Sequence, residues 1–287
     1  MIIALVVLSA LLHATWNALL RLERDKDRAL VAATLVATLF ATSVAGVRWA
    51  LGQPPFASPS GLGFTVLAGV FEAGYFATLA RAMERGNLGL VYTISRGGAV
   101  LVVWPLSIAL YAEVATLPAI GGSVVVLCGL ALSGRGAAGS DRGDGRGAVA
   151  WAAACAASIA GYHLAYKAAL LDATNPSACF AVSLGVSALI NLGRLGRLGR
   201  LGSAPPGALR ALVRARWRQV IVIGVVCGGS FLILMEALAI GGSGYVLTLR
   251  NTSVLFAAGM SALIGERPTR IALAGAVLVA AGAALMA

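Results

Sequence analysis

Charged residues are scarce in this chain of 287 residues. Asp, Glu, Lys and Arg make up 11% of it, whereas a soluble domain has about 25%. Apolar residues make up 59%, and the mean hydropathy is +0.89. A soluble protein of this length has too little interior to bury so much apolar surface. The shortage of charge therefore excludes an ordinary globular enzyme, a disordered chain and a nucleic-acid-binding module.

Residues that typify cofactor and metal sites are also few. The four cysteines lie in apolar stretches without CxxC spacing, so we interpret them as small buried side chains. The only two histidines have no convergent carboxylates and fall short of a zinc ligand set. No Walker lysine motif, nucleophile elbow or HExxH motif occurs. We therefore predict no cofactor, no metal site and no ATP hydrolysis.

Long apolar runs are abundant instead. Runs of about 18–24 residues can cross the roughly 30 Å of bilayer hydrocarbon as helices. The run that starts at Ile2 has no basic segment before it, so we interpret it as a membrane helix and not as a cleavable signal. The sequence predicts an all-α polytopic membrane protein with ten transmembrane helices, at 2–20, 29–50, 61–80, 88–111, 114–133, 148–170, 176–193, 219–240, 244–264 and 269–286.

Two polar stretches interrupt these runs. Residues 134–147 are Gly-rich and charged, which is typical of a flexible linker. Residues 193–218 contain a repeated Leu-Gly-Arg triplet and four further arginines, and we predict a basic loop that lies against anionic lipids. The linker divides the chain into two halves, 1–133 and 148–287.

The two halves repeat each other. With an offset of 153, nine of the 20 residues from Glu113 to Leu132 are identical to their counterparts, beginning with Glu266. With an offset of 154, Arg96 meets Arg250, and with an offset of 150, His13 meets His163. Five spans per half place the second half upside down relative to the first. We therefore predict two inverted five-helix repeats, an arrangement found in many secondary transporters.

The positive charges fit this arrangement. The loops after spans one, three, five, seven and nine hold 18 of the 22 Lys and Arg residues, and the opposite side holds only Arg48 and Lys167. The positive-inside rule places the basic loops in the cytoplasm and both termini outside.

Three stretches resemble a known family: HATWNALLR at 13–21, YFATLARAMERGNLGLVYTISRG at 75–97, and the closing 245–287 with its Gly-Glu-Arg turn. They are similar to the EamA family of the drug/metabolite transporter superfamily, which consists of ten-helix permeases built from two five-helix repeats. The resemblance implies a permease of the cytoplasmic (inner) membrane. It also implies cytosolic termini, opposite to the charge count. It specifies no substrate.

Two arginines lie deep inside predicted spans, where a charge costs about 2.5–3.5 kcal/mol on insertion scales. We predict that Arg96 and Arg250 face each other across the repeat axis and bind an anionic or zwitterionic substrate group, because guanidinium binds two oxygens at once. The alternative is neutralisation by a protein carboxylate or by helix-terminal carbonyls.

Two carboxylates are candidates for proton coupling. Glu72 is central in its span, where low dielectric favours a carboxyl that exchanges protons near neutral pH. A static ion pair of Glu72 with Arg96 or Lys167 is the alternative. Glu236 is closer to a span end. We expect Glu113 and Glu266, at turns, to cap helices.

Further polar and aromatic side chains are predicted to line a central cavity. His13, Trp16 and Asn17 share one helix face, and His163, Tyr166 and Lys167 repeat this spacing. Helix–helix hydrogen bonding is the alternative role. The predicted substrate-binding set is Arg96, Arg250, Trp16, Asn17, Tyr75, Tyr92, His163 and Tyr166.

These observations predict a secondary transporter that moves a small polar metabolite by alternating access, with or without proton coupling. An intramembrane lipid- or headgroup-modifying enzyme and a membrane scaffold are the alternatives. The expected partners are a small-molecule solute and anionic lipids at the basic loops, with no nucleic acid, in a monomer or a homodimer.

Overall fold

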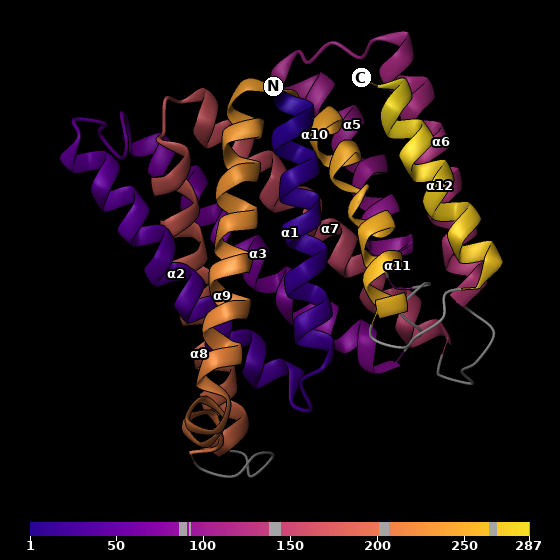
Figure 1. Ribbon diagram of the computed structural model, residues 1–287. Helices are drawn as coiled ribbons and strands as arrows, with labels where there is room; N and C mark the ends of the chain where they lie inside the picture. Colours follow the sequence, from indigo (N-terminus) through magenta and orange to yellow (C-terminus); the bar gives the residue numbers. More distant parts are fainter. Residues whose placement is uncertain (86–90, 92, 138–144, 201–206, 264–268, 287) are drawn as a thin grey trace.

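The computed structural model describes residues 1–85, 91, 93–137, 145–200, 207–263 and 269–286 (Figure 1). Within these ranges the secondary structure is helical, with no strand. The elements are α1 (Ile2–Arg21), α2 (Lys26–Ala50), α3 (Pro59–Arg85), the π-helix η1 (Thr93–Gly97), α5 (Gly98–Tyr111), α6 (Leu117–Ala137), α7 (Gly145–Leu171), α8 (Pro176–Arg200), α9 (Ala208–Ile240), α10 (Ser243–Arg250), α11 (Ser253–Leu263) and α12 (Arg270–Leu285).

Seven of the described helical stretches are long and apolar enough to cross a membrane. They lie in α1, α2, α3, η1 with α5, α7, α8 and α9. The predicted fifth and tenth spans have shorter apolar segments, Leu117–Ser133 in α6 and Arg270–Leu285 in α12. The predicted ninth span is divided into α10 and α11, which the run of apolar residues alone did not reveal.

The predicted basic loop at 193–218 is largely helical, which corrects that prediction. Helix α8 continues to Arg200 and α9 begins at Ala208, while residues 201–206 lie outside the described ranges. Leu and Arg are good helix formers, and their frequency in the triplet outweighs the glycines. The linker at 134–147 is likewise helical at both ends, while its residues 138–144 lie outside the described ranges.

Small residues bring several helices into close contact. At Gly129 in α6, an added Cβ atom would lie 2.7 Å from the carbonyl oxygen of Gly275 in α12. Ser9 and Ser230 each donate a hydrogen bond to the other's carbonyl oxygen, at 2.7 and 3.0 Å, which joins α1 to α9. Outward-facing side chains such as Leu110 and Val277 remain exposed, as expected for a surface that contacts lipid.

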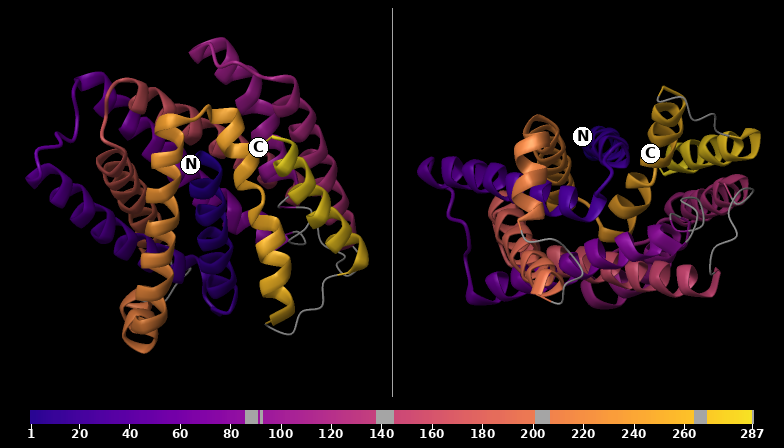
Figure 2. Two further views of the ribbon diagram at one scale, coloured as in Figure 1. Left: turned by 45° about the horizontal axis from the view of Figure 1, so that its top comes forward. Right: turned by 90° about the horizontal axis from the view of Figure 1, so that it is seen from below.

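Both termini lie at one end of the helices, and the turn after α1, the end of α8 and the start of α9 lie at the other (Figure 1). The left-hand view of Figure 2 shows the same separation.

Candidate functional site

Irregular backbone positions the two buried arginines. Arg96 is in the π-helix η1, directly before the regular helix α5. Arg250 is the last residue of α10, and Asn251 and Thr252 form the turn before α11. Single-turn π-helices and helix breaks occur often at functional sites, because they redirect side chains and free backbone groups.

His13 lies between the two arginines. Its Nε2 contacts Arg96 Nη2, and its Nδ1 lies 3.1 Å from Arg250 Nη2. Trp16 Nε1 also donates to His13 Nδ1, at 3.2 Å. A neutral imidazole has one acceptor nitrogen, whereas guanidinium groups only donate. His13 therefore cannot satisfy both arginines, and the predicted meeting of Arg96 and Arg250 takes place through this ring.

Arg250 is the least satisfied charged group of the described core. Its side chain is 2% exposed, and its guanidinium lies 4.3 Å from the ring centre of Phe231. Its Nη2 also lies 3.4 Å from Ser230 Oγ, whereas Nε and Nη1 have no hydrogen-bond partner. No ion pair to Arg250 occurs among the described residues. An unpaired buried charge is costly, so an anion that accepts from Nε or from Nη1 would be strongly stabilised.

Glu72 lies fully buried on α3. Its Oε2 accepts a hydrogen bond of 3.1 Å from the Tyr166 hydroxyl, which is also 2.8 Å from Ser183 Oγ. Its Oε1 has no partner within the described part of the chain. A carboxylate with one uncommitted oxygen in an apolar interior is able to take up a proton or face a cation.

The remaining predicted site residues divide into two groups. His163 is fully buried with neither ring nitrogen bonded, and its ring lies 5.3 Å from that of Tyr162. The Tyr75 ring lies 5.7 Å from the Tyr162 ring, so Tyr75 joins the same aromatic cluster. Asn17, in contrast, donates a hydrogen bond of 2.7 Å from Nδ2 to the carbonyl oxygen of His13, within its own helix. Tyr92 lies outside the described residues.

Glu236 is not part of this central cluster. It accepts a hydrogen bond of 2.5 Å from Arg48, and both side chains are about one-third exposed, at 38% and 32%. This partly exposed ion pair joins α2 to α9, so a structural role is sufficient to explain it. Glu236 remains a predicted proton-coupling residue. It differs from Glu72 because its carboxylate is paired with an arginine, whereas Glu72 Oε1 has no partner among the described residues.

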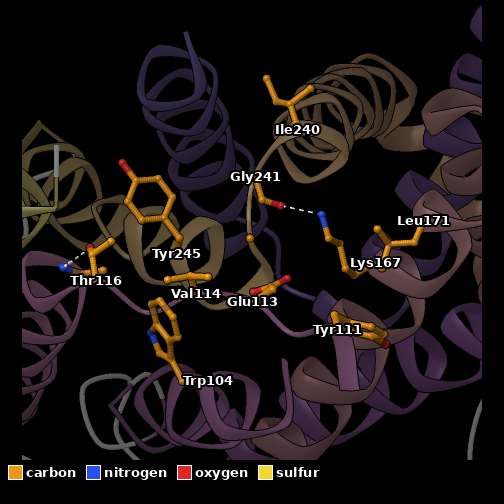
Figure 3. A pocket seen from close by; sticks show the side chains of 12 residues that line it. Trp104, Tyr111, Glu113, Val114, Thr116, Lys167, Leu171, Ile240, Gly241 and Tyr245 are labelled. Atoms are coloured by element: carbon orange, nitrogen blue, oxygen red, sulfur yellow. Dashed lines mark hydrogen bonds between the residues drawn. The ribbon is translucent and has the colours of Figure 1, made fainter. Parts of the chain in front are cut away.

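A cavity of about 450 Å³ lies where the chain passes from α5 to α6 and from α9 to α10 (Figure 3). Lys167 donates there to the carbonyl oxygens of Leu238 (3.1 Å) and Gly241 (2.8 Å), at the end of α9. Glu113 accepts from the backbone N–H groups of Ser243 (2.7 Å) and Gly244 (3.5 Å), at the start of α10. Each charge thus lies at the helix end that it stabilises.

These caps were only partly foreseen. Capping was predicted for Glu113, but the helix that it caps begins 130 residues later in the chain. The Gly241-Gly242 pair, which interrupts the apolar run, was the sequence signal for this break. Glu266 lies outside the described residues.

Outside the membrane-spanning segments, Asp172 joins the α7–α8 turn to the start of α3. Hydrogen bonds from Ser58 and Ser60 (2.5 Å) hold the pKa of this exposed carboxyl below its usual range. The contact fixes the end of the helix pair α3 and α7, from which Glu72 and Tyr166 project.

Together these features define an all-helical, multi-pass membrane protein with a buried and incompletely satisfied polar cluster. Residues 146–287 match the model of the EamA-like transporter family, so the second half of the chain belongs to this membrane transporter family. The resemblance to the EamA family is thereby confirmed.

A solved crystal structure, described only as that of a protein, is similar to nearly the whole chain. The TM-score is 0.72 at 17% identity, and the similarity covers 99% of this chain and 95% of that one. At this identity the likeness shows the fold alone. No curated protein matches the sequence.

Proposed function

We propose that this protein is a secondary active transporter that moves a small solute with an acidic group across the cytoplasmic (inner) membrane by alternating access. The observation that carries the proposal is the buried guanidinium of Arg250. Among the described residues, two of its nitrogens have no hydrogen-bond partner and no carboxylate forms an ion pair with it. A bound carboxylate would accept a charge-assisted hydrogen bond from Nε or from Nη1, which point to different edges of the guanidinium.

The uncommitted oxygen of Glu72 supports a second element of the proposal. A proton or the amine of a zwitterionic solute would satisfy Glu72 Oε1, just as an acidic group would satisfy Arg250. Tyr166 links Glu72 to α8 through Ser183, so occupancy of the carboxylate would alter the contact between these helices. Glu72 is therefore the proposed proton-coupling residue.

Alternating access requires two units that move against each other, and we propose two inverted repeats of five spans in this role. The helix contacts support a two-fold relation between them. The repeat offset pairs Gly122 with Gly275 and Gly129 with Gly282, and in space Gly122 contacts Gly282 while Gly129 contacts Gly275. A two-fold axis exchanges these two contacts.

Other helix pairs follow the same rule. Under the repeat, α1 corresponds to α7 and α3 to α9. The chain packs α3 against α7 and, equivalently, α1 against α9. The alternative function, an enzyme that acts on lipid headgroups, does not require two repeats that move against each other.

Ligand-dependent thermal unfolding tests the acidic-group site. The detergent-purified protein is heated with a panel of monocarboxylates, dicarboxylates, amino acids, phosphonates and lipophilic cations. A binder present at a hundred times its Kd adds about 2.7 kcal/mol of stability. We expect acidic or zwitterionic compounds to stabilise the wild type and to lose this effect in Arg250→Gln.

The matched control is Arg48→Gln, which removes an arginine from a partly exposed ion pair. It should retain ligand stabilisation. If only lipophilic cations stabilise the protein, or if Arg250→Gln responds as the wild type does, the acidic-group site is wrong.

A further inference from the structure

The first helical segment of α9 runs in a different direction from the rest of that helix. Residues 208–215 precede Arg216, whose φ and ψ of −129° and 25° leave the helical region. Figure 1 shows this segment nearly end-on at the lower end of α9, so it lies across the direction of the spanning helices. A segment across the spans runs along the membrane plane. We call residues 208–218 the basic elbow.

The basic elbow has the composition of an interfacial helix. Leu209 and Leu212 are partly buried, while Val213 and Trp217 are 37% and 52% exposed. Arg210 and Arg214 are one helical turn apart and exposed. A helix with an apolar side, arginines on the other side and a tryptophan is typical of one that lies at the boundary between headgroups and acyl chains.

Neighbouring carboxylates are already engaged elsewhere. On the adjacent α1–α2 turn, Asp25 pairs with Arg28 and Asp27 pairs with Arg194. Glu23 Oε2 is 3.4 Å from Arg216 Nε, and this ion pair joins the kink in α9 to the α1–α2 turn.

Three arginines of the elbow therefore carry charge that the nearby carboxylates do not neutralise. Arg210, Arg214 and Arg218 make no ion pair within the described ranges. Arg218 lies 5.2 Å from the ring centre of Trp217, a contact that keeps its guanidinium at the level of the tryptophan. Three exposed guanidinium groups beside an interfacial tryptophan form a surface that is complementary to lipid phosphates.

We propose that the basic elbow binds the phosphate headgroups of anionic phospholipids, and that this end of the molecule faces the cytoplasmic leaflet. This orientation follows the positive-inside count and is opposite to the cytosolic termini that the family resemblance implies. Free phosphate has the same chemistry, but the orientation along the membrane plane and the exposed Trp217 favour a headgroup over a dissolved ion. The proposal is independent of the transported solute.

Lipid binding to the purified full-length protein tests this proposal. The protein in neutral detergent is titrated with phosphatidylglycerol or phosphatidylcholine, and bound lipids are counted by native mass spectrometry. The test variant carries Arg210→Gln, Arg214→Gln and Arg218→Gln. The control carries Arg81→Gln, Arg85→Gln and Arg135→Gln, which removes the same charge from exposed positions on α3 and α6.

We expect the wild type and the control to prefer phosphatidylglycerol, and the elbow variant to lose this preference. Each basic residue near an anionic surface strengthens binding by about fivefold, so the loss should approach 100-fold. An equal preference in the elbow variant would overturn the proposal. If inorganic phosphate displaces phosphatidylglycerol at millimolar concentration, the site takes the free ion and the lipid assignment is wrong.

The salt dependence of phosphatidylglycerol binding to the wild type provides a second test, should the elbow variant fail to fold. Binding should weaken steeply as the ionic strength rises from 0.05 to 0.5 M, by about tenfold or more, because counterions screen exposed charges. Binding that is insensitive to salt would contradict an electrostatic headgroup site.

Discussion

Two guanidinium nitrogens of Arg250, Nε and Nη1, have no hydrogen-bond partner among the described residues. The partners of this residue explain why it is suited to an exchangeable ligand. His13 and Ser230 hold one terminal nitrogen, and the Phe231 ring supports the guanidinium plane. The orientation is thus fixed by neutral groups, and the charge remains available.

At the residue scale, the pKa of Asp172, outside the membrane-spanning segments, can also be predicted. Replacing Ser58 and Ser60 by alanine removes the donors that lower the pKa of Asp172, so this pKa should rise towards its ordinary value of about 3.9. Because the folded-state pKa is lowered, the contact stabilises fully above the ordinary pKa and loses its effect as the pH falls through the lowered value.

Carboxyl-carbon NMR titration of selectively labelled protein measures this change. Ser43→Ala, at an exposed serine that bonds only within its own helix, serves as control and should leave the titration of Asp172 unchanged. An unchanged pKa in the double variant would show that the serine hydroxyls do not control the carboxylate.

At the scale of elements, α10 is a short helix with a discontinuity at each end. Gly241 and Gly242 separate it from α9, and Asn251 and Thr252 separate it from α11. Its start borders the cavity near Glu113, and its last residue is Arg250. The short helix α10 therefore connects the cavity to the arginine.

Glu113→Ala should destabilise the protein by about 1 kcal/mol, because it removes the acceptor for the first backbone N–H groups of α10. Thermal or denaturant unfolding in detergent measures this loss. Glu236→Ala, which breaks a partly exposed ion pair, should cost less. Equal effects of the two substitutions would contradict the capping role.

The α6–α12 contact yields a second prediction at this scale. Gly129→Ala would place Cβ 2.7 Å from backbone atoms of α12 and should destabilise the protein by about 1–3 kcal/mol. Gly121→Ala meets nothing within 4 Å and should be neutral or stabilising. If the two substitutions change the free energy of unfolding by the same amount and in the same direction, close backbone packing of α6 against α12 is contradicted.

At the scale of the whole molecule, the sequence was most informative about the course of the chain through the membrane. Apolar runs and turn residues located the helices, because bilayer thickness imposes a minimum length on each span. The repeat offset also predicted that Arg96 and Arg250 would occupy related positions, and both lie at irregular backbone. The helical ends at 193–200 and 208–218 were missed, because their polarity was interpreted as a loop.

Partners distant in the sequence could not be predicted in the same way. That Glu236 contacts Arg48 and that Lys167 binds the carbonyls at the end of α9 depends on helix packing, which hydropathy does not encode. The sequence therefore supplied the polar residues of the site, while the fold separated those that cap helices from those that remain unsatisfied.

Transport by the reconstituted protein tests the central claim most directly. Proteoliposomes are loaded with the acidic compound that gives the largest thermal stabilisation, and exchange with the same labelled compound outside is followed with and without an imposed pH gradient. Wild-type protein should accumulate unaltered label, Arg250→Gln should not, and Glu72→Gln should exchange label without responding to the gradient. A compound that binds but stays outside, or that is recovered chemically changed, would contradict a transporter with Arg250 at its site.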